Sequence, residues 1–172
     1  MDFKNQLLAE ASRTNIDLIV NSIDGNISLF EELFPLIYSS NGYLANRAGW
    51  VVEKCAEKYP SLVEPHLDEI IDFLPNIRFG GLRRVLLKVL ILLYIPENRR
   101  SEIVDICLSW LESPKEKVAV KVYSMQILAD FCKSEPGMIP EFLSILENHY
   151  DRNSFAFQSR ANKIFDEFKD YI

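Results

Sequence analysis

The feature that most restricts the fold of this chain is a short pattern that returns at nearly constant spacing. A basic residue followed by a small or branched apolar residue occurs four times, at intervals of 37, 37 and 39 residues. The four pairs are Arg47-Ala48, Arg84-Val85, Lys121-Val122 and Arg160-Ala161. Repetition over this distance is typical of solenoids, in which each unit buries its apolar face only by stacking on its neighbours.

Segments with the apolar period of a helix follow one another along the whole chain. In one of them, Leu44, Ala48, Val51 and Cys55 recur three or four residues apart, which is the spacing of one helix face. We therefore predict an all-α fold of about four helix pairs, forming a single domain over residues 1–172. The predicted pairs are 28–59, 61–95, 100–133 and 138–172, and two short helices within 1–25 cap the stack.

The most apolar run in the chain extends from Gly81 to Ile95. It is too short to cross a bilayer, which takes about 20 apolar residues, and three basic residues interrupt it. We predict a buried helix covered by neighbours on several sides, and no association with a membrane. The three cysteines lie far apart and the N-terminus carries no export signal, so we expect a cytoplasmic protein.

Two sequence patterns predict where helices begin. Ser28 with Glu31 has the spacing of a capping box, in which each side chain binds the backbone N–H of the other. Ser113-Pro114 places a capping serine before a proline at the first helical position. We predict that one helix begins at each pattern.

Two segments carry a resemblance to a known superfamily. Residues 46–56, which begin Asn-Arg-Ala-Gly-Trp-Val-Val, and residues 118–129 resemble the second helices of HEAT and armadillo repeats. The resemblance covers about residues 28–171. It implies a right-handed α-α superhelix, in which first helices line the convex side and second helices line the concave side.

Charge is distributed unequally between the first and second helices of the predicted pairs. The first helices hold twelve acidic residues and one basic residue, whereas the second helices hold thirteen basic and seven acidic residues. In the arrangement that the resemblance implies, the concave groove is mildly basic and the convex side is acidic.

The candidate binding site is a ridge of aromatic and basic residues on the second helices. Aromatic residues and arginine are the residue types that most often anchor protein interfaces. The predicted partner-binding residues are Tyr43, Arg47, Trp50, Arg84, Lys121 and Arg160. Two structural alternatives stay open: Trp50 packs between helices, and the aligned basic residues pair with carboxylates of the neighbouring repeat as structural cations.

The chain carries no recognisable catalytic signature. Its two histidines, His66 and His149, stand in neither a metal nor a triad pattern, and no glycine-rich phosphate loop is present. We predict a non-catalytic protein without metal or cofactor.

Two kinds of partner fit the predicted groove. The first is an acidic or amphipathic segment of another protein, which makes the chain a protein-binding scaffold. The alternative is nucleic acid, because some alkylpurine DNA glycosylases are similar in build; the net charge of −6 predicts few phosphate contacts. A homodimer formed by the central helix, or by Phe155 with Tyr171, also stays open.

Overall fold

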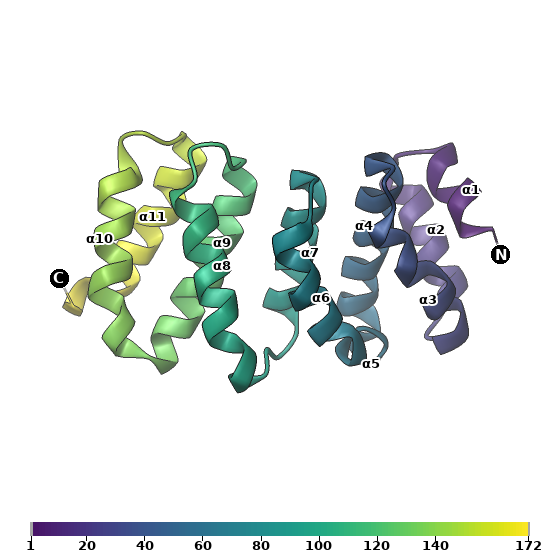
Figure 1. Ribbon diagram of the computed structural model, residues 1–172, viewed down its shortest axis with the longest axis horizontal. Coiled ribbons are helices and arrows are strands. Elements are labelled where there is room, and N and C mark those ends of the chain that lie inside the picture. The colour runs from purple at the N-terminus through teal and green to yellow at the C-terminus, as the bar shows by residue number, and fades with distance from the viewer. Residues whose placement is uncertain (1, 172) are drawn as a thin grey trace. The chain divides into compact units, whose positions relative to one another are not determined.

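The computed structural model describes residues 2–171, and every regular element among them is a helix (Figure 1). The prediction of an all-α fold built from helix pairs is confirmed. Contacts group the chain into two compact units that divide between Ile95 and Pro96, whereas the sequence predicts one domain. We call them the N-terminal unit and the C-terminal unit. Residue 172, at the end of the last predicted pair, lies outside the described residues.

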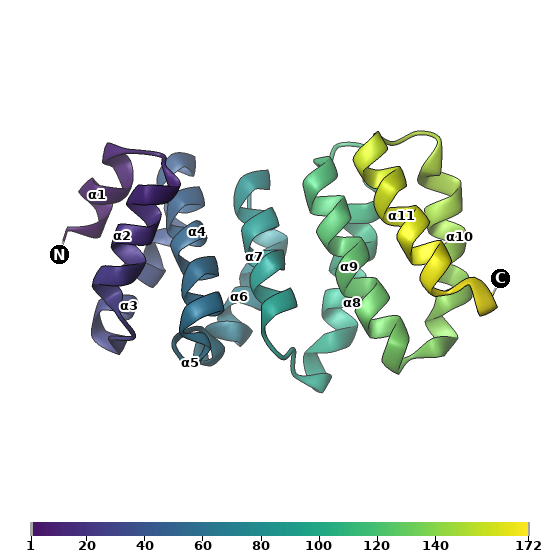
Figure 2. The same ribbon diagram turned by 180° about the vertical axis from the view of Figure 1, so that it is seen from behind.

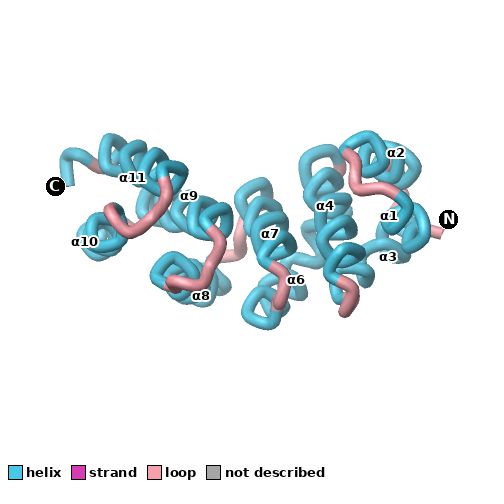
Figure 3. The backbone as a smooth tube through the Cα atoms, turned by 90° about the horizontal axis from the view of Figure 1, so that it is seen from above, coloured by secondary structure: helices cyan, strands magenta, loops and turns pink. Residues whose placement is uncertain are grey.

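The N-terminal unit consists of two leading helices and two helix pairs. Within it, α4 and α7 lie on one side and α3 and α6 on the other, as seen from above (Figure 3). The α-helices are α1 (Phe3–Ala9), α2 (Arg13–Ile23), α3 (Ile27–Leu33), α4 (Gly42–Lys58), α5 (Pro60–Val63), α6 (Leu67–Phe73) and α7 (Gly80–Leu92).

Prolines divide the first helices of both pairs in the N-terminal unit into short pieces. Pro35, Pro65 and Pro75 each stand near the start of a 3-10 turn, because proline has no N–H to donate to an α-helical ladder. The turns are η1 (Phe34–Tyr38), η2 (Glu64–His66) and η3 (Leu74–Asn76).

The C-terminal unit is built from two helix pairs arranged in two layers. Helices α8 and α10 form one layer, and α9 and α11 form the other, which faces the viewer in Figure 2. Its elements are η4 (Glu97–Arg99), α8 (Arg100–Glu112), α9 (Val118–Ser134), η5 (Pro136–Met138), α10 (Ile139–Tyr150), α11 (Phe155–Glu167) and η6 (Lys169–Tyr171).

Both predicted helix starts are wrong. Helix α3 begins before Ser28 because Asn26 caps it, with its side-chain oxygen accepting from the Leu29 N–H at 3.1 Å. Helix α9 begins only at Val118, four residues after Pro114. The intervening residues 115–117 are all charged and have no apolar side chain to bury, so they remain in a turn.

The apolar run predicted as the central helix forms α7, which packs against α4. Its buried residues are Leu82, Val85, Leu86, Leu87, Val89 and Leu90. Full burial of each leucine contributes about 2 kcal/mol, so this face provides much of the unit's cohesion. The prediction of burial is wrong for Leu92 and Tyr94, which are exposed at the end of the run. No helix within residues 2–171 is long and apolar enough to span a bilayer.

Candidate functional site

Helix α4 begins at a cap that also sets the position of Tyr43. The Asn41 side-chain oxygen accepts from the backbone N–H groups of Tyr43 and Leu44 at 3.0 and 3.3 Å. Tyr43 therefore lies in the first turn, where 75% of its surface is exposed. Trp50, two turns further along the helix, is half-buried. Of these two predicted aromatic anchors, Tyr43 offers more surface to a partner.

Arg47 contacts the end of a neighbouring helix. Its Nη1 donates to the Leu7 carbonyl oxygen at 2.5 Å, and the Asn15 amide nitrogen donates to the carbonyls of Gln6 and Glu10 at 2.9 and 3.1 Å. The last carbonyls of a helix have no partner within it, so these donors satisfy the C-terminal end of α1. Arg47 thus has a structural role, but its acceptor is a backbone carbonyl of α1 and not the carboxylate of a neighbouring repeat that the alternative expected.

Arg84 differs from the other basic residues of α7. Arg83 donates its Nε and Nη2 to the Ile77 carbonyl oxygen at 2.9 and 2.6 Å, and Lys88 pairs with acids of α4. Within residues 2–171 the half-buried Arg84 guanidinium makes no hydrogen bond or ion pair. Arg84 is thus available to a partner.

An ionic network connects α4 to α7. The buried Glu53 carboxylate accepts a short hydrogen bond from Lys88, which also contacts Glu57 at 3.1 Å; Lys54 donates to Glu57 at 2.6 Å. The bond from Lys54 lowers the pKa of Glu57, and the bond to Glu53 raises the pKa of Lys88. Both shifts favour the charged forms, so the network holds the two helices in register.

In the C-terminal unit, Lys121 and Arg160 also reach neighbouring elements. Lys121 is only 4% exposed and donates from Nζ to the Asn153 side-chain oxygen at 3.3 Å, and its burial lowers its pKa. Arg160, on α11, donates to the Gln126 side-chain oxygen on α9 at 2.7 Å. Lys121 therefore offers little surface to a partner. Arg160 is half-buried, so part of its side chain stays exposed.

A shallow hollow of about 340 Å³ lies where α9 and α11 adjoin. We call it the α9–α11 hollow, and it is lined by Val122, Phe155, Ala156, Ser159, Arg160 and Lys163. Phe155 is 84% exposed, and Lys163 is exposed without a hydrogen bond or ion pair inside residues 2–171. Sequence reasoning included Arg160 but not Lys163. The sequence held one signal for this hollow. Phe155 lies off the helix face that carries the buried residues Phe157, Ala161 and Ile164, so its ring is expected on the surface.

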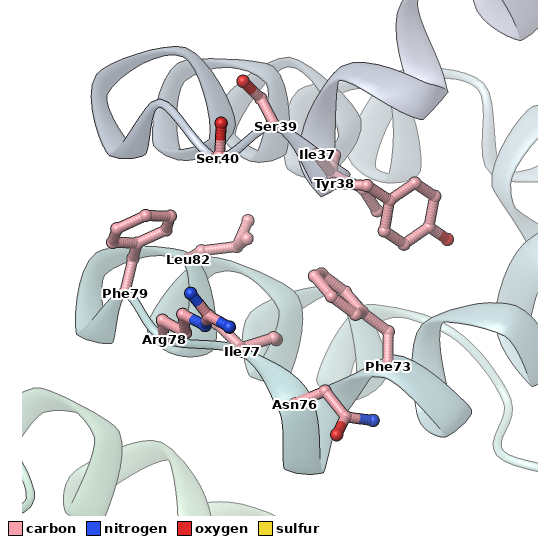
Figure 4. A pocket seen from close by; sticks show the side chains of 10 residues that line it. All are labelled: Ile37, Tyr38, Ser39, Ser40, Phe73, Asn76, Ile77, Arg78, Phe79 and Leu82. Carbon is pink, nitrogen blue, oxygen red and sulfur yellow. The ribbon is translucent and has the colours of Figure 1, made fainter.

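A second cavity, of about 310 Å³, opens between the turns that lead into α4 and α7 (Figure 4). We call it the turn pocket; residues 37–40, 73, 76–79 and 82 line it. The rings of Tyr38, Phe73 and Phe79 contribute to its wall, and the Arg78 guanidinium lies beside Leu82 and Ile77. Sequence reasoning missed this pocket because its two sides come from turns about forty residues apart.

The three cysteines are buried, and His66 is paired with carboxylates. Burial raises the pKa of the Cys55 and Cys107 thiols to about 12 and that of Cys132 to about 11, so all three are protonated thiols near neutral pH. The His66 ring lies 3.0 Å from Glu31 and 3.5 Å from Glu69, and joins α3 to α6. Among residues 2–171 no group of three or more His, Cys, Asp or Glu side chains is placed to hold a metal ion.

Comparison with known proteins places the chain in a family. Residues 3–168 match the family model described as a HEAT repeat domain. No curated protein and no solved structure gives a significant match. HEAT repeat domains typically act as protein-interaction scaffolds and are usually non-catalytic. Since the match covers nearly the whole chain and the helices pack in pairs as such repeats require, the chain belongs to the HEAT repeat domain family.

Proposed function

We propose that this chain is a non-catalytic scaffold that binds an acidic or amphipathic segment of a partner protein on the exposed face of its second helices. The family supports the general role, since HEAT repeats usually mediate protein binding. The observation that carries the proposal is Phe155, a large aromatic side chain that is 84% exposed beside two basic residues.

The α9–α11 hollow supplies both components of such a site. Burying a phenylalanine side chain contributes about 2 kcal/mol, so covering Phe155 gives a partner an apolar anchor. Arg160 and Lys163 line the same hollow and attract a carboxylate. An amphipathic segment that presents an apolar residue and an acidic residue on one face matches this combination.

The N-terminal unit repeats the combination on a smaller scale. Tyr43 is 75% exposed at the start of α4, and Arg84 on the adjacent α7 has no ionic partner within residues 2–171. We therefore assign the partner contacts of this unit to Tyr43, Arg84 and the exposed part of Trp50. Arg47 contributes indirectly, by anchoring α1 against α4.

The proposal is tested by affinity capture followed by a direct binding measurement. The wild-type chain and the double variant Phe155→Ser, Lys163→Gln are incubated with nuclease-treated lysate of the source cell, and captured proteins are identified. A peptide from the captured partner is then titrated calorimetrically. We expect the double variant to bind at least about tenfold more weakly, because it loses the apolar anchor and one cation.

The matched control is Ile27→Ser, which removes an exposed apolar residue of α3, a first helix of the N-terminal unit. It is expected to bind like the wild type. Capture that nuclease abolishes identifies nucleic acid as the partner and contradicts the proposal. Peptide binding that the double variant leaves unchanged contradicts the assignment of the α9–α11 hollow.

A further inference from the structure

The turn pocket has walls that are held in place before any ligand arrives. The Tyr38 and Phe73 rings pack edge to face, with their centroids 4.6 Å apart. The Tyr38 hydroxyl donates to a Glu69 carboxylate oxygen at 2.7 Å. On the opposite side the Phe79 ring lies so close to Gly42 that an added Cβ there would come within 2.8 Å of it. Aromatic walls fixed in this way lose little conformational entropy when a group binds between them.

The pocket has a partly polar lining, to which Ser39, Ser40, Asn76 and Arg78 contribute. Arg78 is exposed and makes no hydrogen bond or ion pair with any residue from 2 to 171, and Ser40 is likewise exposed without a side-chain hydrogen bond in that range. The floor is apolar, because Ile37, Ile77 and Leu82 are buried beneath it. A cavity with an apolar floor and an unpaired cation among its polar lining residues is complementary to an apolar group that carries a carboxylate beside it.

The size of the pocket limits the ligand further. Its volume of about 310 Å³ is at the lower end of the range for small-molecule sites and is sufficient for one large side chain. Both sides are chain turns at the ends of helices, so the opening is accessible to an extended segment (Figure 4). Of the possible sources of an apolar group with an adjoining carboxylate, a peptide segment also agrees with the protein-binding character of the family.

We infer that the turn pocket is a binding site for an extended partner peptide, which inserts an aromatic or branched aliphatic side chain between Tyr38, Phe73 and Phe79 and pairs an adjacent Asp or Glu with Arg78. This site is separate from the second-helix surface of the proposed function. Each can therefore fail without the other.

The probe is the synthetic peptide acetyl-Ser-Phe-Asp-Ser-amide, titrated into the full ¹⁵N-labelled chain and followed by the amide resonances of Ser40 and Phe79. Two matched peptides replace Phe by Ala or Asp by Asn. We expect saturable shifts with the first peptide, binding about threefold weaker with the Asn peptide because an exposed ion pair is lost, and no saturation with the Ala peptide.

The variant Arg78→Gln is expected to bind the Asp and Asn peptides equally, whereas Arg152→Gln, another exposed arginine, keeps the preference for Asp. Ser40→Trp fills the opening and abolishes the shifts; if it does not fold, Arg78→Gln still decides the outcome. Two results would overturn the inference. One is that the peptide shifts amide resonances outside the pocket but not those of Ser40 and Phe79. The other is that Arg78→Gln still binds the Asp peptide more tightly than the Asn peptide. Tighter binding of free 3-phenylpropanoate than of the peptide would also overturn it, since the occupant would then be a small acid.

Discussion

The four aligned basic residues have the same place in the repeat but different contacts. Arg47, Lys121 and Arg160 each donate to an oxygen on another element, namely a helix-end carbonyl or a side-chain amide. Arg84 has no such acceptor within residues 2–171. At the residue scale, therefore, the repeat pattern mainly reflects packing between elements, and Arg84 is the exception.

The contrast between Arg47 and Arg84 gives a stability prediction. Arg47→Met should lower the free energy of unfolding by about 1–2 kcal/mol, because the Leu7 carbonyl loses a charged donor. Arg84→Met, the matched control on α7, should change it by no more than about 0.5 kcal/mol. Urea denaturation followed by circular dichroism measures both values. Equal effects of the two substitutions would show that Arg47 does not anchor α1.

Lys121 gives a prediction about pH. Burial lowers its pKa below the ordinary value of 10.5, so between the folded pKa and 10.5 the unfolded chain binds more protons than the folded chain. Folding therefore carries no penalty from Lys121 above pH 10.5, where the amine is neutral in both states. The free energy of unfolding falls as the pH drops from 10.5 to the folded pKa, because the buried amine must then be charged. The melting temperature of the wild type, relative to that of Lys121→Met, should therefore rise as the pH is raised from about 7 towards 10. A constant difference would mean that the lysine is not desolvated by folding.

At the element scale, the contact between α4 and α7 depends on a glycine. A Cβ added at Gly49 would lie 2.5 Å from the Leu82 Cδ1 atom, and Leu82 is itself buried. The ionic network of Glu53, Lys88 and Glu57 spans the same pair of helices. Close backbone approach and charge pairing thus act together to position α7 against α4, and with it the Arg84 side chain.

Gly49→Ala tests this close approach. Because Leu82 is buried, its end has little room to move, and overpacking of this kind costs about 1–3 kcal/mol. The gain in helix propensity is about 1 kcal/mol, so we expect a net loss of stability of up to about 2 kcal/mol. Gly137→Ala is the matched control, since no atom lies within 4 Å of its added Cβ. Its free energy of unfolding should stay the same or rise by up to about 1 kcal/mol. If Gly49→Ala stabilises the chain, Leu82 has repacked and the contact is not tight.

At the scale of the whole molecule, the charges separate by layer inside each unit. The first-helix segments of the N-terminal unit, 28–38 and 61–74, hold six acidic residues and no lysine or arginine; those of the C-terminal unit, 100–112 and 138–151, hold six acidic residues and one arginine. Like charges on one layer repel, and the repulsion between exposed groups is screened by salt.

This distribution predicts that sodium chloride stabilises the chain. Raising its concentration from about 0.01 M to about 1 M shortens the screening length from about 30 Å to 3 Å, and should raise the melting temperature by a few degrees. The triple variant Glu32→Gln, Asp105→Asn, Glu147→Gln removes exposed first-helix charges and should show a smaller increase. Lys169→Gln, which makes the chain more acidic, should show a larger one. Identical increases in all three proteins would refute a role for repulsion.

Much of the fold could be predicted from local patterns. The apolar period of α4, the run that forms α7 and the spacing of the basic residues from Arg47 to Arg160 all depend on neighbours in the sequence, so they indicated helix pairs and a repeat. Helix starts were less predictable. Asn26 and Ser28 are both residue types that cap helices, so the sequence does not choose between them, and the structure has Asn26 as the cap.

The candidate sites depended on contacts between distant residues. Leu7 lies forty residues before Arg47, and the turn pocket combines residues from two turns about forty residues apart. Periodicity places a side chain on a helix face, but it does not show which acceptor on another element lies within hydrogen-bond distance. Sequence alone therefore established an all-α repeat with basic second helices. Only the tertiary structure decided which basic and aromatic side chains are buried or bonded to another element and which stay exposed. The exposure of each side chain depends on how the helices stack.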